Sequence, residues 1–187
     1  MQHLMLDLEF LGKPPLARLC TIGAVFFDPK TGELGARFYV RVNWAEETDQ
    51  TLPFDASTVA WWMTQPDAAA FEILTNEDRY PLFQALHGLS EYIAQHCGVK
   101  DVQVWGNGSD CDCVILGGAY KSLFLPVPWQ FWNTRDVRTI VQLARDLRGV
   151  DIKRAIPLNG TKHHGLHDAI HQAQYVSHGF QVLGGAS

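Results

Sequence analysis

The order of strand-like and helix-like segments constrains the fold of this chain more than any other feature. An alternating segment at 3–10, an apolar run at 19–27 and a third strand-like segment at 36–42 are joined by tight turns. A short strand is expected at 102–106, and helices are expected at 55–63, 79–97, 113–124, 135–147 and from about 166 to 176 or a little beyond. Three turn-linked strands followed by helices and short strands indicate an α/β fold, a mixed β-sheet flanked by helices.

The length and composition predict one compact domain over residues 1–187. Hydrophobic residues make up 47% of the chain and charged residues 19%, which is enough apolar surface for a core. The sequence contains no apolar run of the roughly 20 residues needed to cross a bilayer, and its N-terminus lacks the pattern of a secretory signal. We therefore expect a soluble, cytoplasmic protein.

The net charge of −5 argues against a protein that coats nucleic acid by positive charge alone, because such proteins are usually basic. An enzyme that meets phosphates through bound divalent cations is compatible with this charge. In such an enzyme the protein itself contributes negative charge to the site.

Asp7 and Glu9 form the first group of candidate functional residues. Side chains two positions apart in a strand lie on the same face, about 6.6 Å apart along the strand. Leu4, Leu6 and Leu8 would occupy the opposite, buried face. Carboxylates in this arrangement can converge on metal ions, although a pair of this kind, taken alone, is more often one solvated face of a strand.

The second group lies in the segment WGNGSDCDCVIL at 105–116, where a strand passes through glycines into a helix. Asp112 is placed to point back over the edge of the sheet and is the preferred metal ligand. Asp110 is the alternative, although an aspartate at a helix N-terminus can be only a cap.

The third group lies in KHHGLHDAIHQAQ at 162–174, where His163 precedes Asp168 by five positions with Gly165 between them. We expect Asp168 to lie within the last helix and His163 in the looser segment before it. A histidine with a pKa near 6.5 suits the role of a general base on a mobile segment.

A structural zinc site is the main rival interpretation. The four cysteines form no pair of CxxC motifs, and free, reduced thiols are the favoured interpretation. Cys111 and Cys113 could nevertheless bind zinc together with His167 and His171, which are spaced by four. This would make the chain a noncatalytic, zinc-stabilised module that binds nucleic acid. The close C-x-C spacing disfavours it, and it leaves the acidic residues without a role.

Together, the candidates supply four carboxylates and one base in the order Asp7, Glu9, Asp112, His163 and Asp168. Two-metal phosphoryl transfer needs hard oxygen ligands for Mg²⁺ or Mn²⁺ and a group that activates water. The combination therefore predicts a metal-dependent nuclease more strongly than any single motif does.

On these motifs the sequence resembles the DEDDh exonucleases of the RNase T-like superfamily, which have an RNase H-like fold. DLEF with TIGAVFFD resembles the first motif, and HHGLHDA the third. WGNGSDCDCVILGGAY with PWQFWNTRDVRTIV is similar to the exonuclease VIII-like branch of phages and prophages, and RNase AS is a more distant relative. The resemblance covers about residues 4–176. Cys111 replaces a usual Phe, and Phe10 replaces a Thr that many relatives carry.

The resemblance implies 3′→5′ hydrolysis of single-stranded nucleic acid to nucleoside 5′-monophosphates, with DNA favoured over RNA in this branch and an exoribonuclease of the RNase AS type as the alternative. It implies two divalent cations, Mg²⁺ or Mn²⁺, with His163 as general base and Asp168 as the last metal-binding aspartate. It also implies that Phe10 and Leu11 contact the terminal nucleotide. Relatives of this kind commonly form homodimers.

The remaining aromatic residues and histidines have simpler interpretations. Trp61 and Trp62 are adjacent and cannot share one helical face, and stacking on bases is an alternative to core packing for them. Core packing is nevertheless the favoured role here, as it also is for Trp129, Phe131 and Trp132. The histidines outside the catalytic group are expected to be ordinary surface or hydrogen-bonded residues, namely His164, His167, His171 and His178.

Overall fold

The computed structural model describes residues 1–45, 52–75 and 78–185. Its centre is a five-stranded sheet in the order β3-β2-β1-β4-β5. The strands are β1 (His3–Phe10), β2 (Leu19–Phe27), β3 (Leu34–Arg41), β4 (Gln103–Gly106) and β5 (Thr134–Asp136). The first three pair antiparallel, whereas β4 and β5 run parallel to β1, so the predicted mixed α/β sheet is confirmed.

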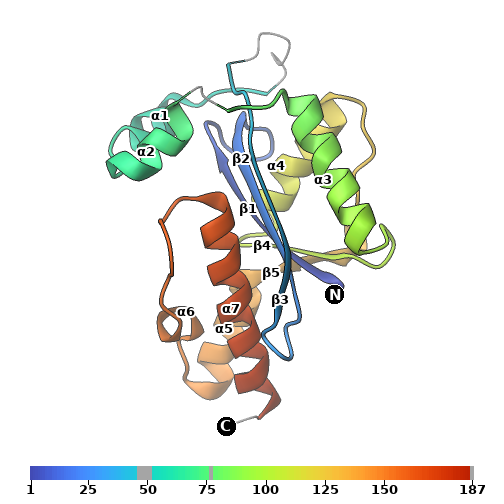
Figure 1. The fold of residues 1–187 in the computed structure, drawn as a ribbon. Helices are drawn as coiled ribbons and strands as arrows, with labels where there is room; N and C mark the ends of the chain where they lie inside the picture. The colour runs from blue at the N-terminus through green and yellow to red at the C-terminus, as the bar shows by residue number, and fades with distance from the viewer. Residues whose placement is uncertain (46–51, 76–77, 186–187) are drawn as a thin grey trace.

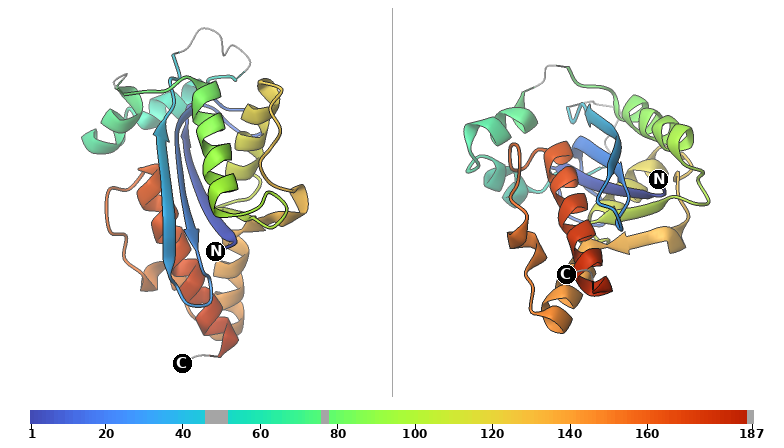
Figure 2. Two further views of the ribbon diagram at one scale, coloured as in Figure 1. Left: turned by 45° about the vertical axis from the view of Figure 1, so that its right-hand side comes forward. Right: turned by 60° about the horizontal axis from the view of Figure 1, so that its bottom comes forward.

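Helices cover both faces of this sheet (Figures 1 and 2). One face packs against α3 (Leu82–His96) and α4 (Asp112–Ser122), and the other against α5 (Val137–Arg148) and α7 (Gly165–Gly184). The short α6 (Ile152–Ala155) precedes the segment that leads into α7. No helix in the described part of the chain is long and apolar enough to span a membrane.

Strand β1 separates the two layers by simple alternation. Leu4, Leu6 and Leu8 are buried, as predicted, and they pack with α3 and α4. Met5 lies on the opposite face and packs with α7. Because side chains alternate along a strand, Asp7 and Glu9 continue the Met5 face toward the N-terminal end of α7. The D-x-E pair therefore lies on a covered face of the sheet and not on a solvated one.

A smaller layer closes the end of the sheet where β1 ends (Figure 1). It consists of α1 (Ala56–Trp62) and α2 (Asp67–Leu74). Asp55 caps α1 by accepting a hydrogen bond from the backbone amide of Thr58. Buried side chains of this layer pack around Trp62 in a cluster that also contains Leu11 and Cys20.

Several elements differ from the sequence-based expectation. Helices α2 and α6 and strand β5 were not predicted. Strand β5 includes Arg135 and Asp136, where a helix was expected, because Asp136 caps α5 and the helix begins only at Val137. Helix α7 extends to Gly184 instead of ending near residue 176. The polar, turn-prone sequence at 43–53 lies partly outside the described residues.

Candidate active site

The two acids of β1 lie among other carboxylates in a poorly hydrated environment. Glu9 is only 7% exposed. Burial raises the pKa of Asp7 well above its usual value, and the charges of Glu9, Asp112 and Asp168 raise it further. The pKa of Glu9 is also raised, by burial and then by the charges of Asp168 and Asp112. Asp7, Glu9 and Asp168 line one cavity, and Asp112 accepts from the amide of Leu8 between the two acids of β1, so the four acids lie close together.

A buried glutamine fixes the first of these acids. The Gln172 side-chain amide donates a hydrogen bond of 2.6 Å to Oδ1 of Asp7. Gln172 lies one helical turn after Asp168 on α7, so both residues face β1. That four-residue spacing was visible in the sequence, although its meaning depends on which face of the helix meets the sheet.

Asp112 enters the site from the start of α4. Its Oδ1 accepts a hydrogen bond from the Leu8 amide at 3.3 Å, and its Oδ2 accepts one from the Asn107 amide at 3.0 Å. It is 5% exposed, and burial raises its pKa to about 6 against the opposing effect of these two bonds. Asp110 is exposed to solvent, so the geometry favours Asp112 as the member of the carboxylate group.

A close contact between two glycines brings the start of α7 onto the sheet. A side chain at Gly23 of β2 would collide with backbone atoms of Gly165 and Leu166 at 2.2–2.4 Å. Gly23 pairs with Asp7 across the β1–β2 ladder. The absence of side chains at Gly23 and Gly165 therefore lets the first turn of α7, with Asp168, reach the carboxylates of β1.

His163 lies just before this helix in the left-handed backbone region, with φ of 63°. That conformation costs roughly 1–3 kcal/mol for a residue other than glycine, although His is among the residues that tolerate it best. The His163 amide donates a 2.7 Å hydrogen bond to Oδ2 of Asp168, which stabilises the turn. As predicted, the aspartate lies in the helix and the histidine in the segment before it.

The turn brings the imidazole to the acids. Ligand atoms of Glu9, His163 and Asp168 all lie within 4.8 Å of one another. Partial burial and then the charge of Lys162 lower the pKa of His163, against the effect of Asp168. The neutral imidazole, the form that can accept a proton, is therefore favoured near pH 7.

The donor set suits a hard divalent cation. Glu9 and Asp168 offer oxygen ligands within reach of each other, and Asp7 and Asp112 lie beside them but outside this close group. Mg²⁺ and Mn²⁺ prefer oxygen ligands, and a bound cation would relieve the repulsion that raises the pKa values of Asp7 and Glu9.

Two cavities meet at Leu8 and Glu9. One, of about 330 Å³, is lined by Asp7, Asn107, His163 and Asp168 and extends toward α6. The other, of about 300 Å³, is bounded by Phe10, Trp61 and Trp62. Leu11 is 2% exposed and packs in the cluster beneath this second cavity, so of the two predicted substrate contacts only Phe10 lines its wall.

The two adjacent tryptophans have different environments. Trp62 is 1% exposed, and its indole donates a hydrogen bond to the Phe10 carbonyl oxygen at 3.0 Å. Trp61 is 44% exposed, and its ring lies edge-on to that of His163 with centroids 5.1 Å apart. Core packing is therefore confirmed for Trp62 and wrong for Trp61.

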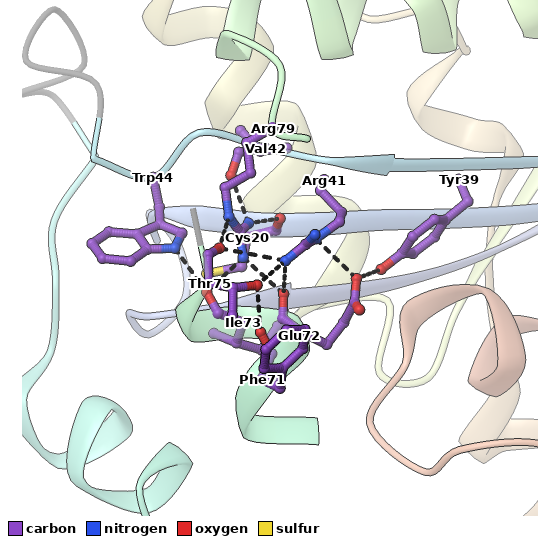
Figure 3. A network of polar contacts seen from close by, with 10 residues as sticks. All are labelled: Cys20, Tyr39, Arg41, Val42, Trp44, Phe71, Glu72, Ile73, Thr75 and Arg79. Atoms are coloured by element: carbon purple, nitrogen blue, oxygen red, sulfur yellow. Dashed lines mark hydrogen bonds and ion pairs between the residues drawn. The ribbon is translucent and has the colours of Figure 1, made fainter. Parts of the chain in front are cut away.

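A network of polar contacts anchors the layer that carries Trp61 (Figure 3). The guanidinium of Arg79 donates to the carbonyls of Cys20 and Val42 and to three carbonyls at the end of α2, those of Glu72, Ile73 and Thr75. Arg41 forms an ion pair with Glu72 at 3.1 Å. These contacts neutralise the exposed carbonyl end of α2 and join it to β2 and β3.

The family comparison decides the class of the protein. A family model described as the 3′-5′ exoribonuclease Rv2179c-like domain matches residues 2–180, nearly the whole chain. The chain belongs to this family. It is a 3′-5′ exonuclease, and the predicted enzyme class is confirmed.

Relatives and solved structures agree with this class. The exonuclease is 23% identical to a protein named exodeoxyribonuclease from Enterobacteria phage T4, over 88% of this chain and 82% of the relative. Its fold matches the nuclease domain of 3′hExo, a DEDDh family member bound to rAMP (TM-score 0.60, 16% identity, 96% of this chain and 91% of that one). It also matches S. pombe Pop2p in its Mg²⁺- and Mn²⁺-bound form (TM-score 0.61, 14% identity, 96% and 83%).

The resemblance to DEDDh exonucleases is thus supported, whereas the exonuclease VIII-like branch stays a prediction. The matched family is described as an exoribonuclease and the phage T4 relative as an exodeoxyribonuclease, so the preference for DNA also stays a prediction.

The zinc site expected by the rival interpretation does not form in the exonuclease. Among the described residues, the group of metal-binding side chains that comes within ligand reach is Glu9, His163 and Asp168. Cys111 and Cys113 are free, and burial raises the pKa of Cys113 well above its usual range and that of Cys111 to about 11, so both are neutral thiols in the metal-free protein. His171 instead hydrogen-bonds the Ile156 carbonyl oxygen at 2.7 Å.

The interpretation of the late aromatic residues was partly wrong. Trp129 is buried, as expected, but Phe131 is 82% exposed and Trp132 60% exposed. These two residues lie in the 3₁₀ turn before β5, at the edge of the sheet, where little of the chain covers them.

Proposed function

We propose that this exonuclease hydrolyses the terminal phosphodiester of single-stranded nucleic acid, using two divalent cations, Mg²⁺ or Mn²⁺, and releasing nucleoside 5′-monophosphates. The observation that carries the proposal is the assembly of one histidine and four carboxylates from three distant segments. Pop2p, a protein of the same fold, has a structure with both metals, which supports the choice of cation.

Each side chain has a role that follows from its position. Asp7, Glu9, Asp112 and Asp168 would hold the cations, which when bound lower the pKa of water and stabilise charge on the phosphate. His163, whose neutral form is favoured, accepts the proton of the attacking water. Asp168 keeps the imidazole facing the site through its bond to the His163 amide. Gln172 positions Asp7 in the same way.

The cavity beside Glu9 suits the terminal base. Phe10 and Trp61 line this apolar space, and aromatic rings of this kind stack on any base without reading its identity. A base pair would have to open before the terminal base could enter, at a cost of a few kcal/mol. The geometry therefore favours unpaired 3′ ends.

DNA and RNA are both candidate substrates. The relative from phage T4 and the resemblance to the exonuclease VIII-like branch favour DNA. The family description favours RNA. A protein distinguishes the two polymers at a given position by a contact to the 2′-hydroxyl, so the preference is decided by measuring matched oligomers.

The test uses 5′-labelled DNA and RNA oligomers of the same sequence, single- and double-stranded, with Mg²⁺, Mn²⁺ or a chelator. We expect progressive shortening of single strands with either metal and none with the chelator. Asp7→Asn keeps the acceptor for Gln172 but removes a charge, and should abolish shortening without loss of fold. Equal activity in the chelator, or wild-type turnover by Asp7→Asn, would refute the two-metal proposal.

A further inference from the structure

The larger of the two cavities contains positively charged side chains in addition to the carboxylates. Beyond the acids its wall is formed by Lys153 of α6 and by Lys162, together with Leu158 and His171. Both lysines are exposed. The ion pairs within the described part of the chain include neither of them, and the nearby acid Asp151 is already paired with Arg145 and Arg154.

The smaller cavity, by contrast, is mainly apolar. Phe10, Trp61 and Trp62 line it, and it shares Leu8 and Glu9 with the larger one. Its one lysine, Lys13, is already paired with Asp55 at 3.0 Å. The carboxylate cluster therefore has an aromatic space on one side and a cationic space on another. A polynucleotide has the same asymmetry around its last linkage, with one base beyond the scissile phosphate and a chain of charged phosphates before it.

We propose that Lys153 and Lys162 bind the backbone phosphate or phosphates immediately 5′ of the scissile linkage. This inference rests on the proposed function. With the terminal base against Phe10 and Trp61, the scissile phosphate lies at the carboxylates, and the rest of the strand leaves through the cavity toward α6. The lysines thus hold the strand on the side of the acids that lies away from the terminal base.

The physical reason is the charge of the site. An acidic protein with four clustered carboxylates repels a polyanion until cations bind, and even then only the scissile phosphate is compensated. Two unpaired ammonium groups a short distance along the strand supply attraction where the metals do not. Lysine suits this role because it contacts phosphate as a flexible point charge without reading the base.

The test combines two lysine variants with substrates that lack one charge. Lys153→Ala and Lys162→Ala are compared with Lys100→Ala, an exposed lysine near the opposite end of β4. Each protein is given single-stranded oligomers in which one linkage, at successive positions 5′ of the scissile bond, is an uncharged methylphosphonate. The measured quantity is kcat/KM for release of the first nucleotide.

We expect a neutral linkage at one or two adjacent positions to lower the kcat/KM of the wild type and of Lys100→Ala by about threefold to tenfold. Lys153→Ala and Lys162→Ala should each lower kcat/KM by a similar factor on the unmodified strand. In each variant, a neutral linkage at the position that the missing lysine contacts should lower kcat/KM hardly any further, because both changes remove the same interaction and their effects are not additive. Lys153→Arg keeps the positive charge, so a neutral linkage at that position should again lower kcat/KM as it does in the wild type.

Lys162 also lowers the pKa of His163, so the pH profile of each variant is recorded and Lys153→Ala decides the outcome. If Lys153→Ala matches the wild type, or if its loss is the same wherever the neutral linkage lies, the inference is wrong. Failure of the wild type to shorten unmodified strands from the 3′ end would instead overturn the proposed function.

Discussion

Replacing Asp112 by Asn should make the metal-free protein more stable at pH 7.5 and weaken its response to Mg²⁺ or Mn²⁺. Folding raises the pKa of this carboxyl from about 3.8 to about 6. The raised pKa adds about 3 kcal/mol to the free energy of unfolding below pH 4, where the carboxyl is protonated. This contribution is lost as the pH rises through 6, because the buried group must then ionise.

The structure also sets the opposing cost. The Asn side chain keeps one oxygen, which accepts a hydrogen bond from either the Leu8 or the Asn107 amide. The other amide loses its acceptor, which lowers the free energy of unfolding by about 1 kcal/mol. The net gain of about 2 kcal/mol should raise Tm in a chelator by about 4–8 °C at pH 7.5 and by less at pH 5. In the wild type a cation bound only to the folded state should raise Tm, and more strongly at pH 7.5 than at pH 5.

Asp110→Asn is the matched control for this experiment. It makes the same chemical change two residues away on an exposed side chain, and it should leave Tm and the metal response unaltered. The reasoning is refuted if Asp112→Asn lowers Tm in the chelator and keeps the full metal response, or if Asp110→Asn reproduces the effect.

Three further changes test other parts of the site. His163→Ala should lower kcat by about 10²–10⁴-fold with little change in single-strand binding, and loss of binding alone would contradict its role as base. Trp61→Ala should weaken binding of single strands by about 1–3 kcal/mol, measured by titration, while Trp61→Phe keeps most of the affinity; equal losses in both would exclude stacking. Arg79→Ala should lower the free energy of unfolding by about 2–4 kcal/mol in denaturant titration, and Arg79→Lys should recover only part of it because an ammonium cannot reach five carbonyls. A wild-type unfolding curve for Arg79→Ala would show that the network around α2 adds no stability.

The features that sequence patterns predicted are those set by local geometry. Strand alternation placed Asp7 and Glu9 on one face and the leucines of β1 on the other, and the structure has the same arrangement. The glycine between His163 and Asp168 correctly indicated a turn followed by a helix. In each case the spacing of a few neighbouring residues determines the outcome, whatever the rest of the chain does.

The features that were missed depend on how distant segments pack. Gln172 matters because α7 turns that side toward β1. Trp61 lines a cavity because the neighbouring Trp62 is buried and hydrogen-bonds the end of β1, which places α1 beside the site. Phe131 and Trp132 were expected in the core because they are large and apolar. The structure leaves them exposed beside the edge strand, and no local pattern distinguishes such residues from buried ones.

The identity of the first product tests the central claim most directly. A single-stranded oligomer with a different base at each end is incubated briefly with the protein and Mg²⁺ or Mn²⁺, and the released nucleotide is identified by chromatography against authentic nucleoside 5′- and 3′-monophosphates. Cleavage at the carboxylates with the 3′-terminal base against Phe10 and Trp61 predicts the nucleoside 5′-monophosphate of the 3′-terminal base. Release of the 5′-terminal nucleotide, of a nucleoside 3′-monophosphate or of internal fragments would contradict it.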